Sequence, residues 1–357
     1  MNTLDSVVTF EGLDPSGMQR IVFEMPEQLR EAVRMMKERS RPFVSAPPGP
    51  LRGPVIVAGM GGSAIGGDLV AALAADHLNR PMLVWRDYGL PKYADKDGIL
   101  ILSSYSGNTA ETLSAFYEGL QRGCRMAVVT SGGEMEAIAT ANGIPVYKLP
   151  CGYPPRGALA FSTVALWTAL SELGLLPASY DQFLGTAEAL EQLRPNYLPD
   201  CPGELNQAKR VAEQLHGGMP VIYGSYSITA VAALRWRGQL AENSKMLASH
   251  HLVPEMNHNE IVGYQLPLDM LKLCMVVFLR DAGEDPRVSK RIEATSKLLQ
   301  GRTKGLIHLH SSGNSRMTRI FSLIYIGDCV SYYAAMLNQV DPYPVEMIDA
   351  LKNSLEA

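Results

Sequence analysis

Residues 54–68, PVIVAGMGGSAIGGD, and residues 98–112, GILILSSYSGNTAET, each join a short apolar run to a loop rich in Gly, Ser or Thr. Each loop leads into a helical pattern, and the first of these helices is expected over residues 69–78. Strands that alternate with helices in this way predict an α/β fold, with a parallel sheet covered on both faces. Ligands of such sheets bind at the carboxyl ends of the strands, which is where both loops are expected to lie.

The strand–helix pattern continues along the chain and then restarts. Further strands are predicted at 81–87, 124–131, 144–150, 218–227, 274–281 and 305–310. The motif GMGGSA (59–64) is echoed by YGSYSIT (223–229), which suggests two related halves. Several prolines in 193–203 mark the boundary between them. The predicted organisation is an N-terminal arm and helix (1–45), a first domain (46–192) and a second domain (193–357).

Composition narrows the class of protein. The chain has 357 residues, enough for two domains, with 46% hydrophobic and 19% charged residues, as in globular enzymes. A net charge of −4 argues against nucleic-acid binding, because no basic surplus is present. No signal-peptide pattern opens the sequence and no run of about 18 apolar residues occurs, so a cytoplasmic protein without a membrane partner is predicted.

The loop after the second quoted strand carries the strongest sign of ligand chemistry. Its hydroxyl and amide side chains come just before a predicted helix, where main-chain N–H groups and the helix dipole favour an anion. These residues are Ser103, Ser104, Ser106, Asn108 and Thr109. No Lys follows in the spacing of a nucleoside-triphosphate loop, so a monophosphate is predicted. Alternatively, Thr109 is only a helix N-cap, with Glu111 completing a capping box.

The first loop allows a second interpretation. Residues 59–64 satisfy the dinucleotide fingerprint G-x-G-x-x-A, and Asp87 lies near the end of the next predicted strand. A nicotinamide-dependent oxidoreductase is therefore an alternative. The fingerprint alone is weak, and the second hydroxyl-rich loop favours a phosphate site over a dinucleotide site.

Both loops resemble the sugar isomerase (SIS) domain, which binds phosphorylated sugars. Three further segments resemble the bifunctional phosphoglucose/phosphomannose isomerases: GYPPRGALAFS (152–162), ENSKMLASHHLVPEMNHNEIVGY (242–264) and IDALK (348–352). The resemblance implies two SIS-type subdomains with doubly wound, flavodoxin-like parallel sheets. It also implies a homodimer with a shared active site. The implied phosphate-binding residues are Gly62, Ser63, Ser104, Ser106 and Thr109.

The implied reaction interconverts glucose 6-phosphate and mannose 6-phosphate with fructose 6-phosphate through a cis-enediolate, without metal or other cofactor. Such an isomerase needs a group that opens the sugar ring, a base that moves a proton between C1 and C2, and positive charge for the enediolate. A non-catalytic sugar-phosphate sensor would keep the phosphate loops without these groups. No helix-turn-helix segment or basic patch is visible, which counts against a sensor that regulates DNA.

Glu242 is the candidate base, because the family's catalytic Glu falls on this position. Composition alone favours an exposed Glu paired with Lys245 or Arg235. Arg156 follows two prolines, and its planar guanidinium suits a delocalised enediolate. Lys352, on the last predicted helix, matches an active-site lysine of the family.

His258 is the candidate for ring opening, since histidine accepts and donates protons near neutral pH. The resemblance implies that it reaches the site from the partner subunit; His250 and His251 are alternatives. His308 and His310 alternate in a strand-like run, and no third metal ligand is evident near them. Tyr343 departs from the small hydroxyl residue expected at its position, which leaves the preference between glucose and mannose substrates open.

Overall fold

The computed structural model describes residues 3–5, 10, 12–39 and 51–356. The chain forms two compact units, which we name the central unit (Met25–Glu188) and the terminal unit (Met1–Glu24 with Ala189–Ala357). This division differs from the predicted ranges 1–45, 46–192 and 193–357. It falls inside helix α8 (Tyr180–Leu193), and the predicted N-terminal arm is divided between the units.

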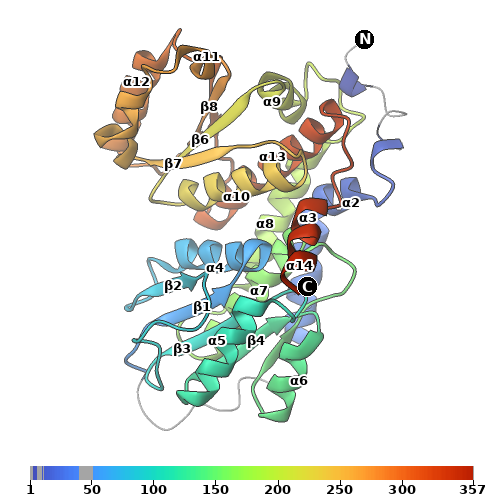
Figure 1. Ribbon diagram of the computed structural model, residues 1–357, viewed down its shortest axis with the longest axis vertical. Coiled ribbons are helices and arrows are strands. Elements are labelled where there is room, and N and C mark those ends of the chain that lie inside the picture. Colours follow the sequence, from blue (N-terminus) through green and yellow to red (C-terminus); the bar gives the residue numbers. More distant parts are fainter. Residues whose placement is uncertain (1–2, 6–9, 11, 40–50, 357) are drawn as a thin grey trace. The chain divides into compact units, whose positions relative to one another are not determined.

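The central unit is built on a five-stranded parallel sheet with the order β2-β1-β3-β4-β5 (Figure 1). Its strands are β1 (Val55–Gly59), β2 (Met82–Trp85), β3 (Ile99–Ser103), β4 (Arg125–Thr130) and β5 (Val146–Lys148). Every residue of β1 and β3 is buried. This agrees with their continuous apolar sequences, because strands in the middle of a parallel sheet are covered on both faces.

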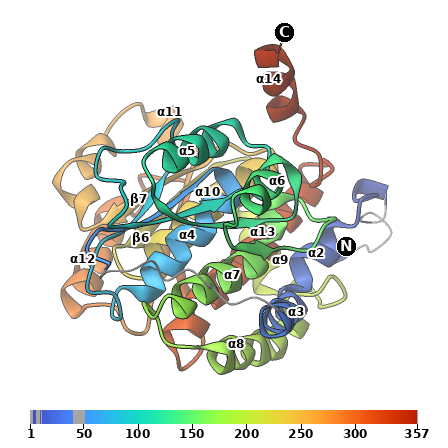
Figure 2. The ribbon, with the colours of Figure 1, turned by 90° about the horizontal axis from the view of Figure 1, so that it is seen from below.

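Helices cover both faces of this sheet. They are α3 (Met25–Glu38), α4 (Gly61–Ala74), α5 (Ala110–Gln121), α6 (Gly133–Ala141) and α7 (Leu159–Glu172), with a short 3-10 turn, η2 (Pro155–Gly157). Helices α5 and α6 bury Phe116 and Met135 against alternate strand residues such as Leu100 and Val128. Helices α4 and α7 pack against each other on the opposite face (Figures 1 and 2).

The terminal unit contains a four-stranded parallel sheet with the order β7-β6-β8-β9. The strands are β6 (Met219–Ser225), β7 (Ser249–Val253), β8 (Cys274–Arg280) and β9 (Gly305–His310). Its α-helices are α2 (Met18–Phe23), α9 (Gln207–Leu215), α10 (Thr229–Glu242), α11 (Leu268–Leu271), α12 (Pro286–Leu299), α13 (Arg316–Leu337) and α14 (Glu346–Glu356). The 3-10 turns are η1 (Thr3–Asp5), η3 (Arg194–Asn196), η4 (Glu255–His258) and η5 (Glu260–Gly263). The two parallel sheets, each with helices on both faces, confirm the predicted doubly wound α/β class.

Helix α13 forms the core of the terminal unit. Among the described residues it is the one helix long and apolar enough to cross a membrane, yet 94% of its apolar window is buried inside the protein. It packs against α9, α10 and α2. The Tyr325 hydroxyl donates to the Phe23 carbonyl oxygen over 2.9 Å, and the rings of Phe23 and Tyr332 meet edge to face. These contacts explain why helix α2 belongs to the same unit as the C-terminal part of the chain.

The structure differs from the sequence-based expectations at three places. Residues 61–68, expected as a loop, are the first two turns of α4. Residues 249–253, where no strand is predicted, form β7 at the edge of the second sheet. The helix predicted within the N-terminal segment 1–45 is interrupted at Glu24 and ends at Glu38; residues 40–45 of that segment lie outside the described residues.

Candidate active site

The first predicted phosphate segment is the first turn of α4. Strand β1 ends at Gly59, Met60 is the extended N-cap, and Gly62 and Ser63 follow at once. Main-chain N–H groups point outward at such a helix start, which favours anions, and the Ser63 N–H itself donates to the Met60 carbonyl oxygen over 3.0 Å. A Cβ on Gly62 would lie 2.7 Å from the Arg156 main-chain nitrogen, so a residue without a side chain is needed there.

The second predicted segment, after β3, is held against the first by hydrogen bonds. The Ser103 hydroxyl donates to the Ser63 carbonyl oxygen over 3.1 Å. The Tyr105 main-chain N–H donates to the Ser63 hydroxyl oxygen over 2.9 Å. The two segments therefore form one surface at the carboxyl ends of adjacent strands, as the sequence pattern predicts.

Hydroxyl groups line the loop between β3 and α5. Ser104 Oγ and Thr109 Oγ1 lie 2.8 Å apart, and Ser104 Oγ also accepts the Gly107 main-chain N–H. The exposed Ser106 accepts the Asn108 main-chain N–H. Thr109 is the N-cap residue of α5, but its side chain makes no capping hydrogen bond. The capping-box alternative is therefore wrong, and the Thr109 hydroxyl belongs to the loop.

Gly107 has a conformation and surroundings that only glycine tolerates. Its φ is +71°, in the left-handed region, and a Cβ there would lie 1.8 Å from the Gly132 carbonyl oxygen. The loop after β3 and the loop after β4 are thus in main-chain contact. This contact limits the shapes that the hydroxyl-bearing loop adopts.

Arg156 lies beside the start of α4. It is buried, at the centre of η2, and the η2 main chain packs against Gly62. The central unit therefore brings six predicted residues into one region, which we name the hydroxyl cradle: Gly62, Ser63, Ser104, Ser106, Thr109 and Arg156. Helix N-termini, hydroxyl donors and one guanidinium suit a small phosphorylated ligand.

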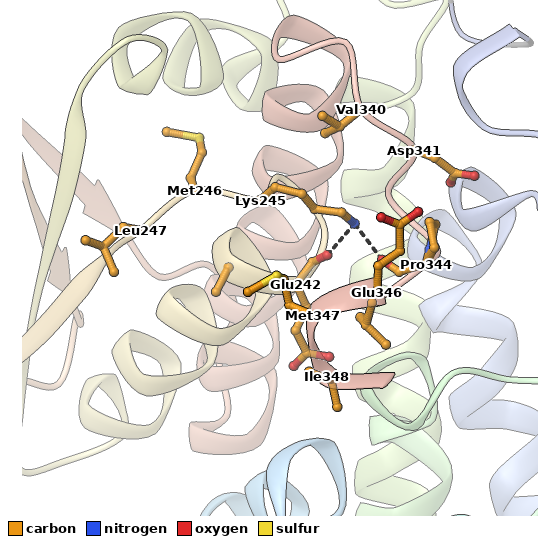
Figure 3. Close-up of a pocket in the computed structure, with 12 residues that line it drawn as sticks. Glu242, Lys245, Met246, Leu247, Val340, Asp341, Pro344, Glu346, Met347 and Ile348 are labelled. Atoms are coloured by element: carbon orange, nitrogen blue, oxygen red, sulfur yellow. Dashed lines mark hydrogen bonds between the residues drawn. The ribbon is translucent and has the colours of Figure 1, made fainter. Parts of the chain in front are cut away.

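Glu242 lies in the terminal unit, as the last residue of α10. It lines a cavity of about 640 Å³ and is half-buried (Figure 3). The cavity is bounded by the end of α10 and by the turn that leads into α14. Its lining residues are Ala241, Glu242, Lys245, Met246, Leu247, Val340, Asp341, Pro344, Val345, Glu346, Met347 and Ile348.

Lys245 joins the two walls of this cavity. Its ammonium donates to the main-chain carbonyl oxygens of Glu242, over 2.7 Å, and of Pro344, over 2.8 Å (Figure 3). Lys245 itself has a φ of +55°, which is uncommon for a residue other than glycine. We name this contact the Lys245 clasp. Its bond to Glu242 runs to the main-chain oxygen, whereas the sequence-based alternative expects an exposed carboxylate pair.

Arg235, the other partner considered for Glu242, forms an ion pair with Asp328. Its Nε lies 2.9 Å from Asp328 Oδ1 and its Nη2 lies 2.6 Å from Oδ2. Both side chains are buried, and burial raises the Asp328 pKa although the guanidinium opposes the shift. The pair fixes α10 to α13, about two helical turns before Glu242.

His258 is exposed, at the end of η4 in the terminal unit. The alternatives lie on β7. His251 Nδ1 is 2.6 Å from Glu260 Oε2, and His250 is half-buried, with a pKa lowered by burial and, to a lesser extent, by Arg237. His258 therefore differs from both in standing on a surface turn rather than in a strand.

Lys352 lies exposed on α14 and is not among the residues that line the Glu242 cavity, although the first residues of that helix are. Tyr343 stands in the turn before α14, and its main-chain N–H donates to Asp341 Oδ1 over 2.8 Å. Within the terminal unit, the structure thus brings Glu242 beside the turn of Tyr343. It does not gather His258 and Lys352 into the same cavity.

The two histidines considered as metal ligands are in different settings. His308 stacks on Phe278, with ring centroids 5.1 Å apart, and its Nε2 lies 3.0 Å from Ser296 Oγ. Burial lowers the His308 pKa, and the positive charge of Arg280 lowers it further by a smaller amount. His310 is exposed. Among the described residues, no group of three or more His, Cys, Asp or Glu side chains is arranged to hold a metal ion.

Two features of the site carry no signal in the local sequence. The Lys245 clasp joins residues 99 positions apart, and Tyr105 links segments 42 to 48 positions apart. Such pairs are revealed only by the fold. The repeated tripeptide Ser-Tyr-Ser, at 104–106 and 225–227, is the one pattern that draws attention to Tyr105.

Known proteins resemble this chain over most of its length. A bifunctional phosphoglucose/phosphomannose isomerase of Caldicellulosiruptor bescii is 42% identical over 334 residues, which are 94% of this chain and 97% of that protein. A protein of the same name from Aquifex aeolicus is 34% identical over 85% of this chain and 90% of its own length.

Two further comparisons agree with these relatives. Residues 204–355 match the family model described as the bacterial phospho-glucose isomerase C-terminal SIS domain. The crystal structure of a glucose-6-phosphate isomerase like protein from Thermus thermophilus covers 96% of this chain and 98% of its own, with a TM-score of 0.62 and 19% identity, which indicates a shared fold. With the hydroxyl cradle and the Glu242 cavity described, the similarity over nearly the whole length shows that the chain belongs to the bifunctional phosphoglucose/phosphomannose isomerase family.

Proposed function

We propose that the protein is an aldose–ketose isomerase that interconverts glucose 6-phosphate and mannose 6-phosphate with fructose 6-phosphate. The observation that carries the proposal is the hydroxyl cradle, in which two Gly/Ser/Thr segments and Arg156 meet at the carboxyl ends of adjacent strands. Membership of a family whose relatives bear the corresponding name supports the same activity. Glucose and mannose differ only at C2, so one planar enediolate serves both epimers.

In this mechanism one predicted domain binds the phosphate and the other supplies the base. Gly62, Ser63, Ser104, Ser106 and Thr109, in the domain predicted at 46–192, hold the phosphate. The Glu242 carboxylate, in the domain predicted at 193–357, takes a proton from C2 of the open-chain aldose and returns it to C1, while the hydroxyl proton moves from O2 to O1, which yields the ketose. The same carboxylate acts in reverse, and delivery to either face of C2 gives glucose or mannose configuration.

Charge develops on the O1 and O2 oxygens as the proton leaves carbon. We assign Arg156 to stabilise that charge, because a guanidinium donates two parallel hydrogen bonds without changing its protonation state. Lys352 is assigned a supporting role near the substrate. A fixed cation supplies the electrostatic stabilisation that a metal supplies in other isomerases, so the proposed reaction needs no metal or other cofactor.

Ring opening is assigned to His258, delivered from the partner subunit of a homodimer. His258 is exposed, and the segment that follows carries five exposed apolar side chains. These side chains belong to Val262, Leu266, Leu268, Met270 and Leu273. An exposed apolar patch of this kind is typical of a protein–protein interface, and a second copy that covered it would receive His258. We propose a cytoplasmic location for the dimer.

The activity is tested by coupled assays that follow fructose 6-phosphate conversion to each aldose, with and without a chelator. We expect both products, at rates that the chelator leaves unchanged. Binding of fructose 6-phosphate without turnover would instead indicate a sugar-phosphate sensor. Loss of activity with the chelator, restored by a metal, would contradict the metal-free mechanism.

The shared site is tested by mixing two inactive variants, Glu242→Gln and His258→Asn, after the two have been unfolded and refolded together. A mixed dimer whose sites combine residues from both chains has one intact site, so random mixing restores about a quarter of the wild-type activity. If His258 served its own chain, the mixed dimer would stay inactive. Size-exclusion chromatography at the assay concentration provides the control for dimer formation.

A further inference from the structure

Tyr105 occupies the middle of the hydroxyl cradle, yet nothing in the proposed reaction uses its side chain. Its main-chain atoms belong to the phosphate segment: its N–H donates to Ser63 Oγ over 2.9 Å, and its carbonyl oxygen accepts the Ser131 main-chain N–H over 3.0 Å. The Ser131 hydroxyl donates to the same carbonyl oxygen over 2.6 Å. Its backbone is therefore held from two sides, and the direction of its side chain is defined.

The phenol of Tyr105 reaches a different part of the chain. Its hydroxyl donates to the Pro150 carbonyl oxygen over 2.8 Å and accepts the Tyr153 main-chain N–H over 2.9 Å. One oxygen thus bridges both ends of the turn at 150–153. The ring is half-buried, and burial raises the Tyr105 pKa, so the hydroxyl keeps the proton that it donates.

The turn at 150–153 leads directly to Arg156 through two prolines. Pro154 has a φ of −66° and Pro155 is the first residue of η2. Proline rings restrict φ, so the connection from Tyr153 to Arg156 is stiff. At its far end the same connection contacts Gly62, where the Arg156 main chain packs against the first turn of α4.

We infer that Tyr105 is a positioning residue, which holds Arg156 in register with the phosphate segments through the turn at 150–153. This inference rests on the proposed function, because it assigns Tyr105 to the stabilisation of the enediolate by Arg156. Phosphate binding depends on other groups: the loop hydroxyls and the start of α4. The bond between the phenol and the turn therefore affects the chemical step and leaves substrate binding almost unchanged.

The test compares Tyr105→Phe with Tyr117→Phe. The first removes only the bridging hydroxyl; the second removes an exposed hydroxyl that donates to Glu134 on the surface of the same unit. We expect kcat of Tyr105→Phe to fall about 10- to 100-fold, the size of effect produced by a small misplacement of a catalytic group. KM for fructose 6-phosphate should change less than about twofold, and Tyr117→Phe should match wild type.

A double-mutant cycle with Arg156→Lys identifies the route of the effect. If Tyr105 acts through Arg156, Tyr105→Phe lowers kcat by less than about twofold in the Arg156→Lys background. If the losses in kcat of the two single variants multiply in the double variant, the inference is overturned. A wild-type kcat in Tyr105→Phe, or an effect confined to KM, would also overturn it. Should Tyr105→Phe fold poorly, 4-aminophenylalanine at position 105 provides a second variant. Its amino group donates to Pro150, and it should retain most of kcat.

The same experiments separate this inference from the proposed function. Absence of isomerase activity in the wild-type protein would remove the proposed function itself. Wild-type activity that survives Tyr105→Phe unchanged would remove only the role of Tyr105.

Discussion

The loop after β3 and the loop after β8 occupy the same place in two sheets of corresponding strand order, β2-β1-β3-β4 and β7-β6-β8-β9. The first is lined by hydroxyl groups and leads into α5. The second, which leads into α12, is filled by charged side chains that bind one another. Arg280 Nε donates to Glu284 Oε1 over 2.8 Å, and Arg319 Nε donates to Asp281 Oδ1 over 2.8 Å.

The two sheets share a strand order, yet the loops at corresponding positions carry different side chains and therefore suit different ligands. An incoming phosphate at the β8 loop would meet two carboxylates, which repel it and already occupy the nearby guanidinium groups. At the β3 loop it meets neutral donors and the start of a helix. The β3 loop of the central unit is therefore suited to hold an anion. At the corresponding position of the terminal unit, ion pairs stabilise the fold instead. Glu242 lies elsewhere in that unit, at the end of α10.

The largest effect is expected from Glu242→Gln, which tests the chemical side of the comparison. The amide keeps the shape of the carboxylate but accepts no proton from carbon, so kcat should fall about 10²- to 10⁴-fold in both directions. Binding of fructose 6-phosphate, measured by calorimetry, should remain. The exposed Glu293→Gln, in the same unit, is the matched control. Unchanged turnover in Glu242→Gln would assign the base to another residue.

The binding side is tested by a pair of variants in the two units. Ser104→Ala with Thr109→Val removes two hydroxyls from the β3 loop. Ser225→Ala removes a hydroxyl from the similar Ser-Tyr-Ser motif, which begins at the last residue of β6. Because each hydrogen bond to a charged group contributes about 1.5–3 kcal/mol, the loss of two in the first variant should raise KM for fructose 6-phosphate at least about 100-fold. Ser225→Ala should leave KM unchanged. An equal rise in both would mean that both loops bind phosphate.

Glu284→Gln tests the structural role of the β8 loop. Its carboxylate is almost fully buried beside Arg280, so neutralising it should lower the free energy of unfolding by about 2 kcal/mol. The steady-state constants at 25 °C should match those of wild type. Denaturant unfolding measures the loss, with Glu293→Gln as the exposed reference. A shift in KM without a loss of stability would show that this loop contacts substrate.

The smallest effect is expected from Lys245→Met, which opens the Lys245 clasp without changing the fold. Loss of the bonds to Glu242 and Pro344 costs about 1 kcal/mol, or about a fivefold fall in kcat if it is expressed wholly in the position of Glu242. Hydrogen exchange should accelerate over residues 340–346. The exposed Lys290→Met controls for the loss of one positive charge. Unaltered exchange over 340–346 would contradict the clasp.

Much of the sheet framework follows from the sequence because buried parallel strands are continuous apolar runs. The strands around Ile101 and Val277 are predicted in their correct places. Strand β7 is not predicted because its sequence, SHHLV, is polar at its centre. An edge strand tolerates such residues. The start of α4 is not predicted as helix because four of its first eight residues are glycines, which disfavour a helix. Close packing overrides that preference: a Cβ on Gly66 would lie 2.7 Å from Ser162 Oγ.

The candidate site also contains some features that the sequence predicts and others that it does not. The hydroxyl groups are adjacent in sequence and precede a helix, so local reasoning finds them. Contacts between distant segments have no local pattern, and the links from Tyr105 to Tyr153 and from Lys245 to Pro344 are of this kind. The roles proposed for Glu242 and His258 rest on resemblance to a family, since neither residue type nor spacing distinguishes them from ordinary surface residues.

The packing of α2 against α13 also constrains the order in which the parts of the protein fold. Residues 25–188 leave the ribosome as a complete unit, so the central unit can fold while synthesis continues. Helix α2, by contrast, is made before the central unit, and about 290 residues separate it from its partner α13. At typical elongation rates this separation corresponds to about 15–60 s, during which Met18, Val22 and Phe23 have no native core to enter. The beginning of this chain is thus among the last parts of it to fold.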